Sequence, residues 1–149
     1  MTWRPHLTVA ALALHQERLL VVEELIRGVR VLNQPAGHVE DGESILEAVV
    51  RETLEETAYH FLPRFVVGTY LWRNPDDGRT TLRFAIAGDI TGKDEQRPLD
   101  RGIVAAHWLE PAVLRRPEMP LRSPLVLQCA EDFLAGRRYE LDLLSHVPG

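Results

Sequence analysis

The chain has 149 residues, of which 45% are hydrophobic and 26% are charged, and its formal net charge is −5. This length and composition are typical of a single globular domain covering residues 1–149. The negative charge argues against a surface that binds nucleic acid by neutralising its phosphates. No apolar run approaches the roughly 20 residues that cross a bilayer, and the N-terminal residues lack the pattern of a signal peptide. The single cysteine, Cys129, cannot form an internal disulfide, so we expect a cytoplasmic protein with no membrane or nucleic-acid partner.

The first half of the chain predicts a hairpin, an irregular segment and a helix. Two short apolar runs, 7–14 and 19–22, are separated by a polar turn and indicate a buried β-hairpin. Residues 33–37 include a proline and a glycine, which favour irregular backbone. Ser44, followed three residues later by a glutamate, indicates a capping box. A helix is therefore expected over residues 44–58.

The second half predicts a further hairpin, a loop, a strand and a second helix. The β-rich segments 64–72 and 80–87 flank a turn sequence and indicate a hairpin. The polar stretch 91–102 is expected to be a loop, and residues 105–109 resemble a short strand. A serine and a proline precede an amphipathic run, which predicts a helix over 124–135. The mixture of strands and helices favours a layered α+β or α/β domain.

The first expected helix carries three carboxylates on one side. At about 100° per residue, Glu52, Glu55 and Glu56 project in similar directions. The apolar stripe that contains Ala48 and Val49 leads directly into them. Ionised carboxylates that face a core are unfavourable unless they are paired or bind a metal, so the pattern predicts a shared divalent cation. The alternative is a solvated helix whose glutamates pair with neighbouring basic residues.

The segment 37–59 as a whole resembles the sequence box of the Nudix family. Its charged positions and their spacing all match: Gly37, five residues, Glu43, seven residues, and then Arg51, Glu52, two residues, Glu55 and Glu56. Two positions depart from the usual pattern, because Thr53 replaces an aliphatic residue and Ala58 replaces the glycine after the acidic pair. Neither departure removes a charged residue, so both concern how the helix packs and ends.

The resemblance implies a fold, a cofactor and roles for the box residues. The implied fold is α+β, an α/β/α sandwich in which a mixed β-sheet lies between helices. The implied ligands of Mg²⁺, with Mn²⁺ as an alternative ion, are Glu52, Glu55, Glu56 and the backbone carbonyl of Ala36. Arg51 would orient Glu52, while Glu43 would brace the loop or help to activate water. A further carboxylate from a later loop, Asp100 or Glu95, would assist.

Segments outside the box also resemble bacterial phosphatases of the Nudix family. With them the resemblance covers nearly the whole chain. These segments are residues 5–10, 20–24, 33–38, 82–84 and 122–125. Such enzymes release terminal phosphate from nucleoside di- and triphosphates and act on hydroxymethylpyrimidine diphosphate. The implied function is therefore Mg²⁺-dependent hydrolysis of phosphate–phosphate bonds in a small-molecule substrate. Two alternatives stay open: a pyrophosphatase of a sugar nucleotide or an oxidised nucleotide, and an inactive ligand-binding module. The sequence indicates no particular oligomeric state.

Four residues outside the acidic cluster are candidates for substrate binding. Arg83 interrupts an apolar strand, and it either contacts phosphate or lies solvated on an exposed face. Tyr70, like Trp72 on the same expected strand, either stacks on a ring or packs in the core. Arg122 precedes a helix start where free backbone donors attract anions. His38 follows the box glycine and is a candidate for phosphate contact or proton transfer.

Overall fold

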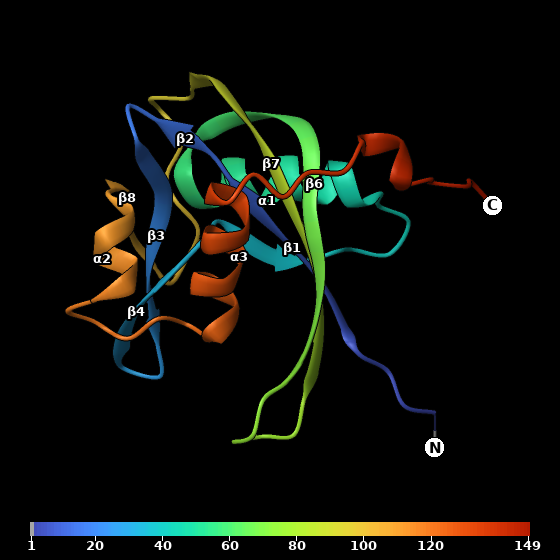
Figure 1. Ribbon diagram of the computed structural model, residues 1–149, viewed down its shortest axis with the longest axis horizontal. Helices are drawn as coiled ribbons and strands as arrows, with labels where there is room; N and C mark the ends of the chain where they lie inside the picture. The colour runs from blue at the N-terminus through green and yellow to red at the C-terminus, as the bar shows by residue number, and fades with distance from the viewer. Residues whose placement is uncertain (1) are drawn as a thin grey trace.

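A computed structural model describes residues 2–149 and shows two four-stranded β-sheets with helices packed on their faces (Figure 1). In chain order the elements are β1 (His6–Leu12), β2 (Leu14–His15), β3 (Arg18–Ile26), β4 (Val29–Asn33), β5 (Ala36–His38), α1 (Ile45–Thr57), β6 (Tyr59–Arg73), β7 (Thr80–Lys93), β8 (Ile103–Leu109), α2 (Pro111–Arg115), α3 (Pro124–Leu134) and the 3₁₀ helix η1 (Leu141–Leu143). The expected α+β class is confirmed.

The first sheet is mixed, as the family resemblance implied. Its strand order is β5-β1-β7-β6, in which β1 and β7 are parallel and the other two pairs are antiparallel. In the second sheet β3 pairs with β2, β4 and β8, all antiparallel. Strand β5 lies at the edge of the mixed sheet, so its outer side is open to residues of the helix that follows it.

Helices cover both faces of the mixed sheet. Ala48 and Val49 of α1 pack in one cluster with Val9 of β1, whereas Cys129 of α3 packs in another cluster with Leu12, from the opposite face of the same strand. Successive residues of a strand point to opposite faces, so the apolar run in β1 has a helix on each side. The predicted α/β/α sandwich is therefore confirmed (Figure 1).

The prediction that 7–14 and 19–22 form one hairpin is confirmed only next to the turn, where Leu14 pairs with Leu19, and is wrong for the rest of the first run. Only the short strand β2 pairs with the start of β3, while β1 lies between β5 and β7 in the other sheet. An apolar run that is buried on both faces does not reveal its partner strands. Residues 33–37 also differ from expectation, because Ala36 begins β5 and the carbonyl of Pro35 accepts a 2.9 Å hydrogen bond from Ala11.

The hairpin expected from 64–72 and 80–87 exists but is much longer. Strands β6 and β7 together run from Tyr59 to Lys93, so the first residues of the predicted loop 91–102 belong to β7. The turn between them projects away from the rest of the molecule (Figure 1). The predicted strand 105–109 and the second helix are confirmed to within two residues, while β4 and α2 were not predicted.

Helix α1 begins as predicted, and it accommodates Thr53 and Ala58, the two residues that depart from the family pattern. The Ser44 side chain accepts a hydrogen bond from the N–H of Glu47, whose own side chain accepts one from Ser44 N–H, so the capping box is confirmed. Ala58 adopts a left-handed conformation with φ of 64°, a conformation that a glycine adopts with less strain. Buried Thr53 donates its hydroxyl to the carbonyl of Val49 at 2.7 Å, which satisfies the polar group.

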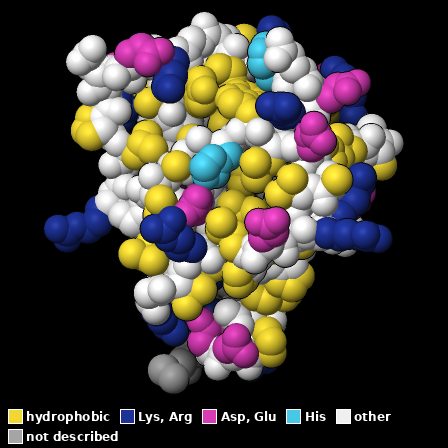
Figure 2. Space-filling model, turned by 90° about the vertical axis from the view of Figure 1, so that its left-hand side faces the viewer, with side chains coloured by type: hydrophobic (Ala, Val, Ile, Leu, Met, Phe, Trp, Pro, Cys, Tyr) yellow, Lys and Arg dark blue, Asp and Glu magenta, His cyan; other side chains and the backbone are white. Residues whose placement is uncertain are grey.

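The surface charge and the helices can be compared with the sequence-based expectations about nucleic acid and membranes. On the face shown in Figure 2, basic and acidic side chains are interspersed with hydrophobic ones rather than gathered into a basic band. Within residues 2–149, no helix combines the length and apolar character needed to span a membrane.

Candidate active site

Arg51 joins the box loop to helix α1. Its Nε and Nη2 atoms donate to the two carboxylate oxygens of Glu43 at 2.7 and 2.9 Å, and Nη2 also donates to the carbonyl of His38 at 3.0 Å. Its Nη1 atom donates to Glu52 at 2.9 Å and to Glu55 at 3.2 Å. The bonds from Arg51 lower the pKa of Glu43, and the bonds to Glu43 and Glu52 raise the pKa of Arg51. Both groups therefore stay charged and hold the loop against the helix.

Glu56 continues the core-facing side of α1 into the protein interior. Its exposed fraction is 9%, and its Oε1 atom accepts a 2.8 Å hydrogen bond from the backbone N–H of Ala36. Burial raises the pKa of Glu56 to about 9, and nearby carboxylates act in the same direction. Arg51 pairs with Glu43, Glu52 and Glu55 and, among the described residues, does not pair with Glu56. A cation at this carboxylate would offset the cost of its burial.

Gly37 is required by the position of Glu52. A Cβ atom added at Gly37 would overlap the carboxylate of Glu52, which lies against the backbone of β5. Burial raises the pKa of Glu52, against the opposing effect of Arg51. The glycine at the start of the box thus allows a helix carboxylate to approach the edge strand closely.

The backbone carbonyl of Ala36 points away from the sheet. Ala36 lies opposite Ala10 in the antiparallel pairing of β5 with β1. The neighbouring ladder bonds, from Ala11 to Pro35 and from Val39 to Leu7, place Ala36 at a position whose N–H and C=O face outward. The N–H reaches Glu56. The outward carbonyl is therefore available as the backbone ligand that the family resemblance implied.

The acidic side chains are near one another but do not converge on one point. Within residues 2–149, no group of three or more His, Cys, Asp or Glu side chains is arranged to hold a metal ion. We expected three carboxylates of α1 to converge on one ion, and in this side-chain arrangement they do not. Arg51 attracts Glu52 and Glu55, while the N–H of Ala36 holds Glu56. The donors are nevertheless all oxygen atoms and include a buried carboxylate without a cationic partner, which suits a hard divalent cation.

Of the two later acidic residues, Asp100 lies close to the box. Its backbone N–H donates to the carbonyl of Glu55 at 3.0 Å. Its charge adds to the effect of burial in raising the pKa of both Glu52 and Glu56. Glu95 lies instead in the exposed turn that follows β7. The structure therefore favours Asp100 as the additional carboxylate.

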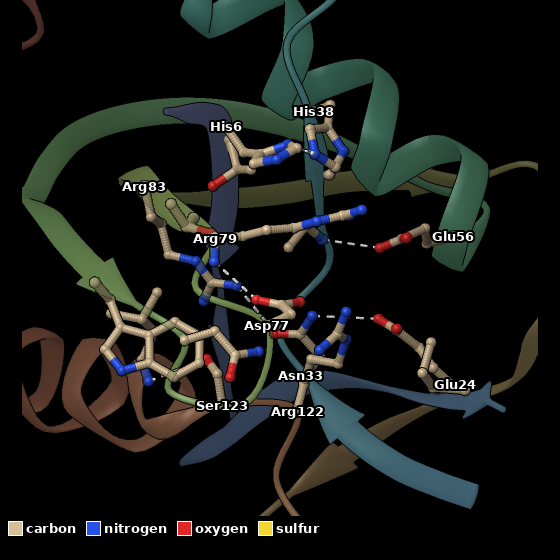
Figure 3. Close-up of a pocket in the computed structure, with 18 residues that line it drawn as sticks. His6, Glu24, Asn33, His38, Glu56, Asp77, Arg79, Arg83, Arg122 and Ser123 are labelled. Atoms are coloured by element: carbon tan, nitrogen blue, oxygen red, sulfur yellow. Dashed lines mark hydrogen bonds between the residues drawn. The ribbon is translucent and has the colours of Figure 1, made fainter. Parts of the chain in front are cut away.

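A cavity of about 290 Å³ adjoins Glu56 and the outer edge of β5. In Figure 3, Glu24 and Glu56 lie on one side of it and Arg83 lies on the other. Arg83 is only 5% exposed, so the prediction of a solvated arginine is wrong, and the alternative, a contact with phosphate, stays a prediction. The guanidinium donates to Gln34 at 3.0 Å and to Asn33 at 3.3 Å, and both partners are neutral. The buried positive charge is thus not offset by a bonded anion.

The other three predicted substrate-binding residues differ in position. Arg122 and His38 both line the cavity, and burial lowers the pKa of His38, with smaller effects in the same direction from His6 and Arg79. Tyr70 does not line it, because its hydroxyl donates to Asp132 at 2.7 Å and its ring packs under α3. The prediction for Tyr70 is therefore corrected to a packing residue. Trp72, two residues further along β6, lines the cavity instead.

Three further cavity residues were not predicted from the sequence. Glu24 and Asn33 line the cavity from β3 and β4, and Arg79 enters it from the β6–β7 hairpin. Arg79 is near enough to lower the pKa of His38. Glu24 could have been predicted, because it is a charged residue near the end of a mostly apolar strand. Figure 3 shows its carboxylate turned into the cavity. No sequence signal distinguishes Arg79 from other exposed arginines.

Comparisons with known proteins agree with this geometry. The pattern of the NUDIX domain matches residues 4–129. The chain is similar to phosphatase NudJ of Escherichia coli strain K12, with 34% identity over 143 residues that cover 96% of this chain and 92% of the relative. Phosphatase NudJ of Shigella boydii serotype 4 shows the same identity and coverage. A solved NUDIX hydrolase from Nitrosomonas europaea is 46% identical, with a TM-score of 0.95 and coverage of 98% of this chain and 99% of that chain.

The family match covers most of the chain, and both the mixed sheet and the loop–helix box have the arrangement expected for it. The relatives match over nearly their entire lengths and not in the box alone. The chain therefore belongs to the Nudix family and is a hydrolase of phosphoric anhydride bonds.

Proposed function

We propose that the protein is a Mg²⁺-dependent phosphatase of small organic di- and triphosphates. The observation that carries this proposal is the position of Glu56, a buried carboxylate with a raised pKa at the wall of a cavity that also contains three arginines. An all-carboxylate cluster next to cationic side chains is suited to a metal-bound polyphosphate. Nucleoside di- and triphosphates and hydroxymethylpyrimidine diphosphate are the proposed substrates, in the cytoplasm.

The proposed metal ligands are the box carboxylates and one backbone oxygen. Glu52, Glu55, Glu56 and the carbonyl of Ala36 would hold Mg²⁺, or Mn²⁺, after Glu52 and Glu55 turn from Arg51 toward the ion. When bound, the ion neutralises phosphate charge and lowers the pKa of a coordinated water. Asp100 adds negative charge at the same place.

The remaining box residues would act by positioning. The bidentate bond between Arg51 and Glu43 holds the loop in place, so the N–H and carbonyl of Ala36 keep their direction. Arg51 also limits the movement of Glu52 and Glu55 by hydrogen bonding. We assign Glu43 and Arg51 to this bracing role, while a carboxylate of α1 accepts the proton from the attacking water.

The substrate phosphates would lie between the box and the arginines of the cavity. Arg83 offers a buried charge bonded only to neutral amides, and Arg122 lies beside the N-terminus of α3. Arg79 and His38 occupy the rim nearer the box. Because charge-assisted bonds to phosphate oxygens are strong in a partly buried site, these groups would orient the diphosphate for in-line attack by water.

A phosphate-release screen tests the proposal. The protein is incubated with Mg²⁺ and a panel of nucleoside di- and triphosphates, hydroxymethylpyrimidine diphosphate, sugar nucleotides and oxidised nucleotides. Orthophosphate and pyrophosphate are measured separately. Mg²⁺-dependent release of orthophosphate from di- and triphosphates is expected, in keeping with relatives named as phosphatases. Activity confined to sugar or oxidised nucleotides would favour the alternative substrates, and tight nucleotide binding without any release would favour an inactive binding module.

A further inference from the structure

Glu24 is a buried carboxylate that the proposed hydrolysis does not use. It lies near the end of β3, is 8% exposed and lines the cavity beside Glu56. Its Oε1 atom accepts a 3.3 Å hydrogen bond from the Nδ2 atom of Asn33. Within residues 2–149, its Oε2 atom accepts no hydrogen bond and is not among the fully enclosed polar atoms. One carboxylate oxygen of Glu24 is therefore open to the cavity.

The orientation of Glu24 is fixed by a chain of hydrogen bonds. Arg83 donates to the Oδ1 atom of Asn33 at 3.3 Å, so the amide nitrogen of Asn33 must face Glu24. Arg83 is itself held by Gln34 at 3.0 Å, and Gln34 donates to the carbonyl of Val126 in α3 at 2.7 Å. Asn33 can therefore only donate toward position 24. The open oxygen of Glu24 is presented to the cavity as an acceptor.

A carboxylate in this place is unsuited to contact phosphate. It would repel the phosphate oxygens that Arg83 and Arg122 attract, and a buried acceptor left without a donor costs free energy. A substrate group beside Glu24 that offers an N–H or O–H would satisfy this acceptor. Trp72 and Ile26 also line the cavity, and both residues line a neighbouring hollow of about 910 Å³ as well. An apolar and aromatic wall in the same cavity as this open acceptor suits a heteroaromatic ring that carries a donor.

We propose that Glu24 selects substrates by accepting a hydrogen bond from an exocyclic amino group on their nitrogen heterocycle. The ring would lie against Trp72 while its amino group reaches the open oxygen of Glu24, since both residues line the cavity. The phosphates would extend from the ring toward Glu56. Asn33 acts as a positioning residue, because it holds Glu24 without touching the ring. This inference rests on the proposed function, since it names the organic part of the same substrate.

The first test compares cytidine diphosphate with its 4-deamino analogue, pyrimidin-2-one riboside diphosphate. The two differ only in the amino group. The unmodified protein should have a kcat/KM at least about tenfold higher for cytidine diphosphate, because loss of one buried hydrogen bond leaves Glu24 unpaired. The variant Glu24→Ala should treat both alike. Glu23→Ala is the matched control, because Glu23 bonds to Arg30 and His107 on the other face of β3 and should keep the preference.

The second test uses Glu24→Gln, which keeps the shape of the side chain. Because Asn33 donates toward position 24, the new amide must turn its oxygen to Asn33 and its nitrogen to the cavity. The donor at this position would then favour the 4-keto group of uracil over the 4-amino group of cytosine. Glu24→Gln should therefore raise kcat/KM for uridine diphosphate relative to cytidine diphosphate about tenfold or more. Thermal melts of both variants establish that they fold.

Three results would overturn the proposal. The first is an equal kcat/KM of the unmodified protein for cytidine diphosphate and its deamino analogue. The second is a preference that survives in Glu24→Ala. The third is a large rise in the Mg²⁺ concentration for half-maximal activity of Glu24→Ala with the preference intact, which would assign Glu24 to the metal. If no diphosphate is hydrolysed, the proposed function fails, and dissociation constants of the two nucleotides measured by calorimetry then test Glu24 alone.

Discussion

The box and the cavity beside it are built in opposite ways. The box occupies one stretch of 23 residues, 37–59, and its charged groups are brought together by one loop and one helix. The cavity shares Gly37, His38 and Glu56 with the box but takes its other residues from strands of both sheets, the tip of a hairpin and the start of α3. On the proposed function, the local site would fix the bond that is broken, whereas the dispersed site would select the molecule that carries it. Changes in the two regions should therefore differ in kind as well as in size.

The largest effect is expected in the box, from Glu56→Gln. The substitution keeps the acceptor for the N–H of Ala36 but removes the negative charge proposed to hold Mg²⁺. Turnover should fall at least about a hundredfold. The metal-free protein should melt no lower than the unmodified one, because burial of the ionised group is unfavourable. Phosphate-release kinetics and thermal melts measure both effects, and unchanged activity would contradict the metal site.

Geometry in the box is tested by Gly37→Ala. The added methyl group would overlap the carboxylate of Glu52, so that carboxylate must move or the edge strand must shift. We expect kcat to fall by roughly tenfold or more and the free energy of unfolding to fall by about 1–3 kcal/mol. The control is Gly92→Ala, because a Cβ added at Gly92 would be 3.7 Å from His60. Gly28→Ala is not a suitable control, because Gly28 has a φ of 80°. Equal loss in both variants would contradict the specific role of Gly37.

These two variants concern residues that the sequence alone identified, and the reason is locality. A helix fixes the relative direction of side chains three and four residues apart, so the side on which Glu52 and Glu56 lie follows from their numbers. The capping box is likewise read from Ser44 and Glu47. Both expectations are confirmed because they depend on no contact far away in the chain.

The cavity was less predictable because strand pairing is not local. The apolar sequence of β1 did not indicate that this strand pairs with β5 and β7 rather than with the next apolar run of the chain. Tyr70 and Trp72 point to the same face of β6, yet one packs under α3 and the other lines the cavity. Only the position of α3, set by tertiary packing, separates their roles.

A cavity change should act on substrate binding more than on chemistry. Arg83→Met removes a buried charge bonded to neutral amides and keeps much of the side-chain volume. If Arg83 contacts phosphate, KM should rise about tenfold or more while kcat changes much less. Steady-state kinetics on the preferred diphosphate measure this difference. A fall in kcat with no change in KM would place Arg83 in the chemical step and weaken the contrast between the two regions.

The brace between Arg51 and Glu43 should show a pH dependence. The Arg51 hydrogen bonds lower the pKa of Glu43 below its ordinary value of 4.5. The stability that this pair contributes is therefore fully present above about pH 4.5 and is lost as the pH falls through the lowered pKa. Glu43→Gln should destabilise the protein near neutral pH, and the difference from the unmodified protein should shrink in acid. Urea unfolding at several pH values measures it, and a difference that grows in acid would contradict the assignment.

The smallest effect is expected from Tyr70→Phe, which tests the boundary of the cavity. The hydroxyl donates to Asp132 at 2.7 Å, and Asp132 keeps partners in Gln128 and Arg137 when that bond is lost. The free energy of unfolding should therefore fall by only about 1 kcal/mol. Kinetic constants should stay within about twofold, since Tyr70 does not line the cavity, whereas Trp72→Leu should raise KM several-fold through loss of ring contact. A larger kinetic effect at Tyr70 than at Trp72 would mean that the substrate ring lies under α3 and not in the cavity beside Glu24.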